Sequence, residues 1–142
     1  MSTRPIEEPL TTEPRSDQRD LAASLHRALT TRDWSLLRDI MVSEVYWVLP
    51  GNNTISGKAS GVDEVVARAE LIASYGPSFT LEHVLLSRDN MALAIHNTAR
   101  RGDLELDEHL ATVCTLDQGR IVAIETYLSD VEGMDAFFQP LN

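Results

Sequence analysis

The stretch that decides the fold is residues 79–128, with the sequence FTLEHVLLSRDNMALAIHNTARRGDLELDEHLATVCTLDQGRIVAIETYL. It contains four runs rich in aliphatic and β-branched residues, which is the composition of β-strands. Short turn-forming segments such as Gln118-Gly119 separate the runs. The four runs are Phe79–Leu86, Met91–Arg100, Leu104–Leu116 and Ile121–Leu128. This arrangement predicts a meander of antiparallel strands.

The residues before the meander have helical spacing. Apolar residues recur every three or four positions over residues 17–30 and 62–73, which predicts a helix in each range. Asp33 can cap a short helix between them, and residues 45–49 have the composition of a strand. Helices followed by a strand meander indicate an α+β fold.

The composition limits the number of domains and the partners. The chain has 142 residues, one cysteine, and 22 Asp and Glu against 12 Lys and Arg, a net charge of −10. Its length suits one domain over residues 17–142, and the three prolines in residues 1–16 predict a flexible tail. The negative charge disfavours nucleic acid and anionic membrane surfaces as partners. No apolar run approaches the ~20 residues that span a bilayer, and no secretory leader is evident, so we expect a cytoplasmic protein.

The last hairpin predicts a pocket with an acid in it. A two-residue turn at Gln118-Gly119 would place Thr112 opposite Glu125 and Leu110 opposite Tyr127 on one face of the sheet. A curved sheet covered by helices encloses a cavity, and a carboxylate that points into a cavity is suited to proton transfer. Glu125 is therefore the first candidate for a catalytic acid or base. The alternative is that Glu125 is an ordinary exposed carboxylate.

The preceding hairpin leaves two registers open. A two-residue turn at Gly102-Asp103 would place Asn97 opposite Glu108 on the pocket face. A loop one residue longer would bring His96 there instead, as a candidate base.

Three segments carry a resemblance to a known family. The run Val45-Tyr46-Trp47-Val48-Leu49-Pro50-Gly51, followed by Gly57 and Gly61, resembles the pattern of SnoaL-like proteins in the NTF2-like superfamily. So do the turn Asp117-Gln118-Gly119-Arg120-Ile121 and the ending Tyr127-Leu128-Ser129-Asp130 before Ala136-Phe137-Phe138. The resemblance covers about residues 17–138.

The resemblance implies a cone-shaped α+β barrel, in which a bent sheet wraps a long helix around a deep pocket, and a homodimer. It also implies a pocket aromatic residue at Trp47, a late-strand tyrosine at Tyr127, and a general acid/base at Asp130. The sequence departs from the family at Glu125, where an aromatic residue is usual. A purely structural alternative for Asp130 is that it caps a helix starting at Val131.

Two functions follow from these observations. The first is a cofactor-independent acid/base enzyme of the cyclase, isomerase, hydratase or epoxide hydrolase type, acting on a small apolar substrate. Its predicted catalytic residues are Glu125, Asp130 and His96, and its predicted substrate-binding residues are Trp47, Asn97, Glu108, Thr112 and Tyr127. The second is a module that binds a small ligand or a partner without catalysis.

The sequence also gives expectations about metal binding and about self-association. The four histidines fall on different predicted elements without a chelating spacing, so we expect no metal site. We expect a homodimer, because Val122, Ile124 and Leu128 would form an apolar stripe on the outer face of the last strand.

Overall fold

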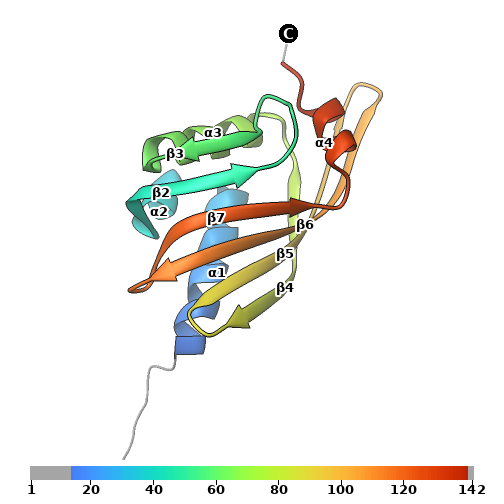
Figure 1. Cartoon of the computed structure of the whole chain (residues 1–142). Helices are drawn as coiled ribbons and strands as arrows, with labels where there is room; N and C mark the ends of the chain where they lie inside the picture. The colour runs from blue at the N-terminus through green and yellow to red at the C-terminus, as the bar shows by residue number, and fades with distance from the viewer. Residues whose placement is uncertain (1–13, 141–142) are drawn as a thin grey trace, which may run out of the picture.

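The computed structural model describes residues 14–140, and its core is a six-stranded sheet in the order β3-β2-β7-β6-β5-β4 (Figure 1). The helices are α1 (Pro14–Thr31), α2 (Trp34–Asp39), α3 (Val62–Ser74) and α4 (Val131–Phe137). The strands are β2 (Met41–Leu49), β3 (Gly57–Ser60), β4 (Ser78–Ser87), β5 (Asn90–Arg101), β6 (Leu104–Asp117) and β7 (Arg120–Leu128). Neighbouring strands are antiparallel except β2 and β7, which are parallel. The predicted α+β class is confirmed.

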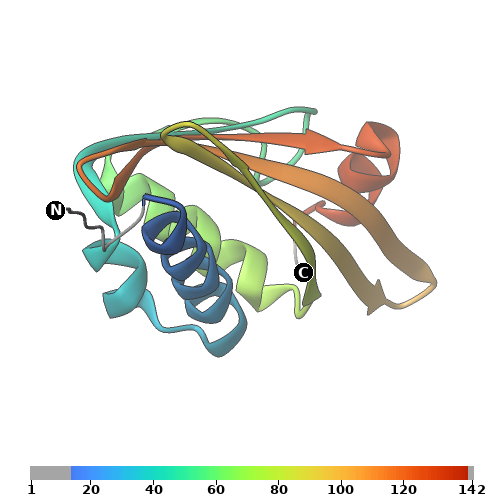
Figure 2. The ribbon, with the colours of Figure 1, turned by 90° about the horizontal axis from the view of Figure 1, so that it is seen from below.

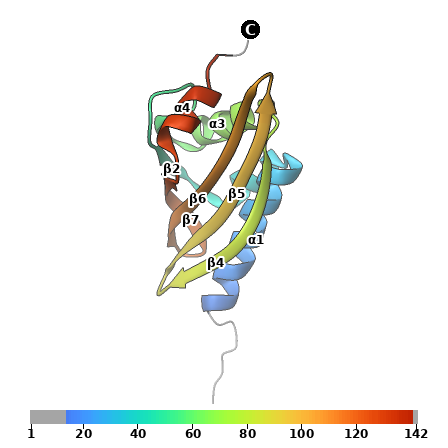
Figure 3. The ribbon, with the colours of Figure 1, turned by 90° about the vertical axis from the view of Figure 1, so that its right-hand side faces the viewer.

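The helices cover one face of the curved sheet. Figure 2 shows α1, α2 and α3 together on the concave side, while no described helix covers the outer side. Figure 3 shows how strongly β4, β5 and β6 bend around α1, with α4 at the far end of the sheet. Apolar side chains of the sheet, such as Leu93 and Ile121, meet Leu25 and Val65 of the helices in one core. None of the described helices is long and apolar enough to cross a membrane.

Local signals placed most elements correctly. The Asp33 carboxylate accepts a hydrogen bond from the Leu36 amide at 3.1 Å, so the predicted cap of α2 is confirmed. Helix α1 begins at Pro14 rather than at Asp17. The predicted tail falls mainly on residues 1–13, which lie outside the described residues. The strand predicted at 45–49 begins earlier, at Met41, and β3 was not predicted at all.

A β-bulge changes the register of the last hairpin. The turn is as predicted, with Asp117 opposite Arg120 and positive φ angles at Gln118 and Gly119. After Leu116 pairs with Ile121, Thr115 pairs with Ala123, so β7 contains one extra residue, Val122. A shift of one residue moves every later side chain to the opposite face.

The predicted partners on this hairpin are therefore wrong. Thr112 lies opposite Thr126, not Glu125, and Leu110 lies opposite Leu128, not Tyr127. Glu125 and Tyr127 belong to the outer face of the sheet.

The other hairpin follows the shorter of the two registers left open. Arg101 pairs with Leu104 across Gly102-Asp103, which places Asn97 opposite Glu108 and His96 opposite His109. Asn97 and Glu108 are buried on the concave face, whereas His96 belongs to the outer face.

Candidate functional site

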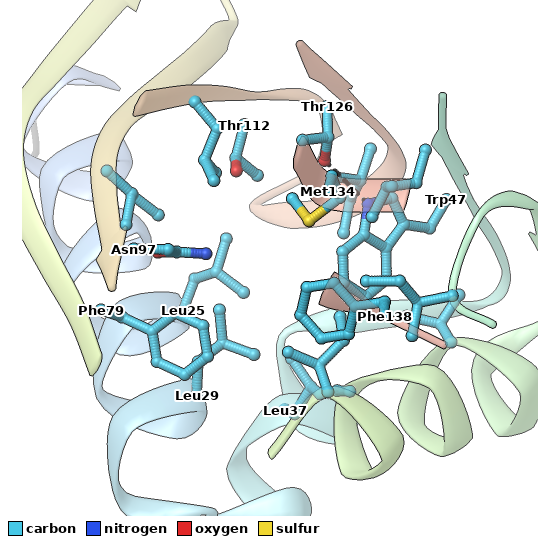
Figure 4. Close-up of a pocket in the computed structure, with 18 residues that line it drawn as sticks. Leu25, Leu29, Leu37, Trp47, Phe79, Asn97, Thr112, Thr126, Met134 and Phe138 are labelled. Carbon is cyan, nitrogen blue, oxygen red and sulfur yellow. Dashed lines mark hydrogen bonds between the residues drawn. The ribbon is translucent and has the colours of Figure 1, made fainter. Parts of the chain in front are cut away.

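A largely apolar pocket lies between the concave face of the sheet and the helices (Figure 4). Side chains from the four helices, from five strands, from the loop after β2 and from the residue after α4 line it: Leu25, Leu29, Leu37, Trp47, Leu49, Ile55, Val65, Ala69, Ile72, Phe79, Ile95, Asn97, Leu110, Thr112, Ile124, Thr126, Met134 and Phe138. The space open to the centres of water molecules inside it is about 60 Å³. Since about 10–15 Å³ by this measure holds one water, the pocket has room for a small molecule.

Three polar side chains interrupt the apolar wall. Thr126 accepts a hydrogen bond from Nε1 of Trp47 at 2.9 Å, so both of these groups have a partner within the protein. Thr112 and Asn97 come from the neighbouring strands β6 and β5, and Figure 4 shows Asn97 extending from β5 into the space across from Trp47. The polar groups therefore come from the sheet, and the helices contribute apolar side chains.

Asn97 is a residue of the pocket wall whose amide oxygen has no hydrogen-bond partner among the described residues. It is 8% exposed, and its Oδ1 atom is buried with no hydrogen bond from the described residues. A buried amide oxygen without a donor is destabilising by roughly 1–3 kcal/mol. A ligand that donates a hydrogen bond, or accepts one if the amide is rotated by 180°, would remove that penalty.

Trp47 is held in place from behind by a buried cation. The Arg68 guanidinium lies 5.2 Å from the centre of the indole ring and donates to the Trp47 carbonyl at 3.0 Å. It also donates to the carbonyls of Ser56 and Gly57, which tie β3 to the same side chain. Desolvation lowers the pKa of Arg68, and the nearby Glu64 carboxylate partly opposes this effect. Arg68 thus fixes one wall of the pocket without facing it.

Glu108 is the buried carboxyl of this region. It is 1% exposed and lies opposite Asn97 on the concave face, although its side chain is not part of the pocket wall. Its Oε1 atom accepts the Asp130 amide at 2.9 Å and the Ser129 hydroxyl at 3.4 Å. Desolvation raises the pKa of Glu108 above that of a free glutamate, and these hydrogen bonds reduce the increase.

The predicted catalytic residues lie outside the pocket in the structure. Glu125 is exposed on the outer face, so the prediction that it points into the cavity is wrong. Tyr127 is 57% exposed on the same face, and its predicted place on the pocket wall is also wrong. Both errors have the same physical cause, the bulge at Val122.

Asp130 and His96 also lie outside the pocket. The Asp130 carboxylate accepts the Gly133 amide at 2.9 Å and caps α4, so the structural alternative stated for it is confirmed. His96 is on the outer face, where its Nε2 atom lies 2.5 Å from Asp107. The structure leaves Trp47, Asn97 and Thr112 of the predicted residues on the pocket wall.

Sequence reasoning missed Thr126, Phe79 and Arg68. Simple alternation puts Thr126 on the same face as Ile124 and Leu128, which the sequence predicts to be the outer face, and the bulge brings it to the pocket wall instead. Phe79 starts the first strand of the meander, where alternation alone does not indicate which face the end of a strand presents. Arg68 lies on the buried side of α3, and an arginine within the apolar spacing of a helix was the available signal.

The outer face contains the residues that could bind a metal ion. Among the described residues, one possible ligand atom each from Glu82, His96 and His109 lies within 4.8 Å of the others. The expectation that the histidines stay apart is therefore wrong for His96 and His109, because β5 and β6 pair them directly.

Comparisons with known proteins give relatives over most of the chain. No family model matches it. It is 28% identical over 123 residues to the uncharacterized proteins Rv0034 of Mycobacterium tuberculosis and Mb0035 of Mycobacterium bovis. The alignment covers 84% of this chain and 94% of each relative.

Solved structures give the same fold at lower identity. Bal32a, from a soil-derived mobile gene cassette, is 21% identical with a TM-score of 0.85, over 89% of this chain and 100% of that chain. An NTF2-like protein from Burkholderia xenovorans is 13% identical with a TM-score of 0.75, over 87% and 97% of the two chains. A candidate SnoaL-like polyketide cyclase from Jannaschia is 15% identical with a TM-score of 0.71, over 89% and 94%. The chain therefore has the NTF2-like fold that its sequence resemblance implied.

Proposed function

We propose that this protein binds a small, mostly apolar molecule that carries one hydroxyl or carbonyl group. The observation that carries this proposal is the amide oxygen of Asn97, which is buried in an apolar wall without a partner from the described residues. Apolar walls with a few placed polar groups are typical of small-molecule sites. The apolar wall would supply most of the affinity, and Asn97 would orient the ligand. Thr112, which lies opposite Leu93 further along the strand pair, is a second polar group on the same wall.

The pocket wall supports binding rather than catalysis as the first choice. It includes no aspartate, glutamate, histidine, lysine or cysteine among the described residues. General acid/base catalysis needs such a group within hydrogen-bond reach of the substrate, directly or through one water. The sequence-based hypothesis of an acid/base enzyme placed Glu125 in that role, and Glu125 is outside.

One observation favours the enzymatic alternative. Glu108 is a buried carboxyl directly across β5 and β6 from Asn97, and such cross-strand side chains are roughly 5 Å apart at Cβ. A small rotation of Glu108 away from the Asp130 amide would bring it toward a ligand held at Asn97. In that case the ligand would be a substrate, and Glu108→Gln would abolish its conversion.

The experiment that tests binding uses two probes of the same shape. Phenol carries a hydroxyl where toluene carries a methyl group, and the two molecules have nearly the same shape and volume. We expect phenol to bind the protein roughly 2- to 10-fold more tightly than toluene, the value of one net hydrogen bond. Isothermal titration calorimetry measures both affinities, and the Asn97 side-chain amide signals in an NMR spectrum report the site.

The matched variants are Asn97→Leu and Thr98→Val. Asn97→Leu removes the amide at similar volume and should eliminate the preference for phenol, while toluene still binds. Thr98 is the next residue on β5 and is exposed, so Thr98→Val should keep the preference. Equal affinities of phenol and toluene for the unaltered protein, or no binding of either, would contradict the proposal. Native mass spectrometry of the purified protein, with and without Glu108→Gln, then tests the enzymatic alternative by comparing the masses of any retained ligand.

A further inference from the structure

The outer face of the sheet brings four chemically active side chains together from three strands. His96 on β5 and His109 on β6 are direct partners in the register, and their rings stack with centres 4.1 Å apart and planes 9° apart. Asp107 lies two residues before His109, on the same face of β6. Its Oδ1 atom is 2.5 Å from Nε2 of His96.

A second β-bulge adds a carboxylate to this group. Leu81 pairs with Ile95 and His83 with Ala94, so Glu82 is the extra residue in β4. Leu81 and Val84 both pack against the core, which leaves Glu82 and His83 on the outer side of the strand. The bulge thereby places Oε1 of Glu82 3.8 Å from Nδ1 of His109.

These side chains match the ligand set of a divalent transition metal. Imidazole nitrogens with one or two carboxylate oxygens suit Zn²⁺ and its neighbours, whereas Ca²⁺ and Mg²⁺ prefer oxygen alone. Ligand atoms of Glu82, His96 and His109 already lie within 4.8 Å of one another. Bonds of 2.0–2.2 Å to a tetrahedral zinc ion would require them to be roughly 3.3–3.5 Å apart.

The remaining approach, at most about 1.5 Å, requires side-chain rotations that also turn the two stacked rings toward a common point. The side chains of His109 and Glu82 are 60% and 41% exposed, so neither is locked by packing. The strands that carry them are fixed by the sheet, which keeps the three Cα atoms in place. Asp107 would hold the His96 ring through its other nitrogen, as carboxylates do beside metal-bound histidines.

We propose that Glu82, His96 and His109 form a Zn²⁺ site on the outer face of the sheet, with Asp107 as the residue that orients His96. The site lies on the opposite face of the sheet from the ligand pocket and shares no residue with it. It is therefore independent of the proposed binding of an apolar ligand, and each proposal stands or fails by its own experiment.

The experiment is equilibrium dialysis of the full chain against ZnCl₂, followed by measurement of bound zinc. We expect saturable uptake of one Zn²⁺ per chain, unaffected by excess Ca²⁺. His109→Ala or Glu82→Gln should weaken binding on the order of 100-fold, and Asp107→Asn by about 10-fold, the range seen for groups that orient ligands. Co²⁺ substitution adds a spectrum that reports tetrahedral coordination.

Two controls separate this site from general surface binding. His83→Ala removes an exposed histidine beside Glu82 on β4, and Glu125→Gln removes an exposed carboxylate on the same face from β7. Both should retain full affinity. Far-UV circular dichroism checks that each variant is folded. Absence of saturable uptake, one ion per two chains, or a loss in either control as large as in His109→Ala would overturn the proposal.

Discussion

Arg68 and Glu108 are the buried charged side chains among the described residues, and they differ in how many hydrogen bonds the protein gives them. Arg68 donates to three backbone carbonyls, so its charge is well solvated by the protein. Glu108 receives one backbone amide and one long contact from a hydroxyl, and its pKa is raised. Arg68 is therefore a fixed structural support, whereas Glu108 is a group whose proton is sensitive to pH.

The raised pKa of Glu108 predicts a pH-dependent stability. The pKa of Glu108 in the folded state exceeds the unfolded value of 4.5, so at pH values between the two the folded protein binds more protons than the unfolded chain. The contribution of Glu108 to the free energy of unfolding therefore falls as pH rises above that value. Glu108→Gln should remove this part of the slope. Urea unfolding at several pH values in a chelating buffer measures it, with the exposed Glu125→Gln as control; equal slopes for Glu108→Gln and the unaltered protein would contradict the assignment.

At the level of the elements, local patterns predicted the helices, the meander and the turn at Gln118-Gly119, because caps, turn residues and apolar spacing act over a few residues. The sequence does not decide the length of the turn at Gly102-Asp103. For the hairpin around Gly102-Asp103 it leaves two registers open, and the structure has the shorter one, with Asn97 opposite Glu108 and no bulge between β5 and β6. The bulges at Val122 and Glu82 could not be predicted, since each depends on how one strand bends over the helices. One undetected residue was enough to move Glu125 and Tyr127 from the pocket to the surface.

The bulge in β7 predicts an unusual tolerance to deletion. Removing Val122 leaves Ile121 opposite Leu116 and Ala123 opposite Thr115, so Ile124 and Thr126 keep facing the core. We expect this deletion to lower the free energy of unfolding by about 1–3 kcal/mol. The loss would come from the changed local bend of β7, because the pairing of β6 with β7 is kept. Ala94 lies in the regular pairing of β5 and β6. Deleting it would turn the side chains of β5 on one side of the deletion to the opposite face of the sheet, and this should prevent folding. Thermal unfolding by circular dichroism compares the two, and similar losses would show that the bulge is not what sets the faces of β7.

The whole molecule has two chemically different sides. The concave side holds the core and the apolar pocket, and the outer side holds Glu125, Tyr127 and the histidine pair. The apolar stripe predicted on the outer face of β7 is wrong for Ile124, which is 3% exposed and lines the pocket instead. The original argument for a homodimer is therefore lost, and any prediction of self-association must rest on the side chains that the outer face presents.

We still predict a homodimer, formed through the outer face. A shallow hollow there includes Ala94, Ala111 and the exposed Tyr127, and Tyr46 is a second exposed aromatic side chain on the strand beside β7. Glu82 and His109 line the same hollow, so this dimer and the proposed zinc site would use overlapping parts of the outer face. Small side chains beside exposed tyrosines let two sheets approach closely, and tyrosine is enriched at protein interfaces. Sedimentation equilibrium should give twice the chain mass of 15.8 kDa. The buffer should contain a chelator, to exclude metal bridging, and enough salt to screen the charge of −10 on each chain. Tyr127→Glu should shift the protein to monomer, whereas Leu104→Glu, at the start of β6 and also exposed, should not; a monomer at micromolar concentration for the unaltered chain would refute the prediction.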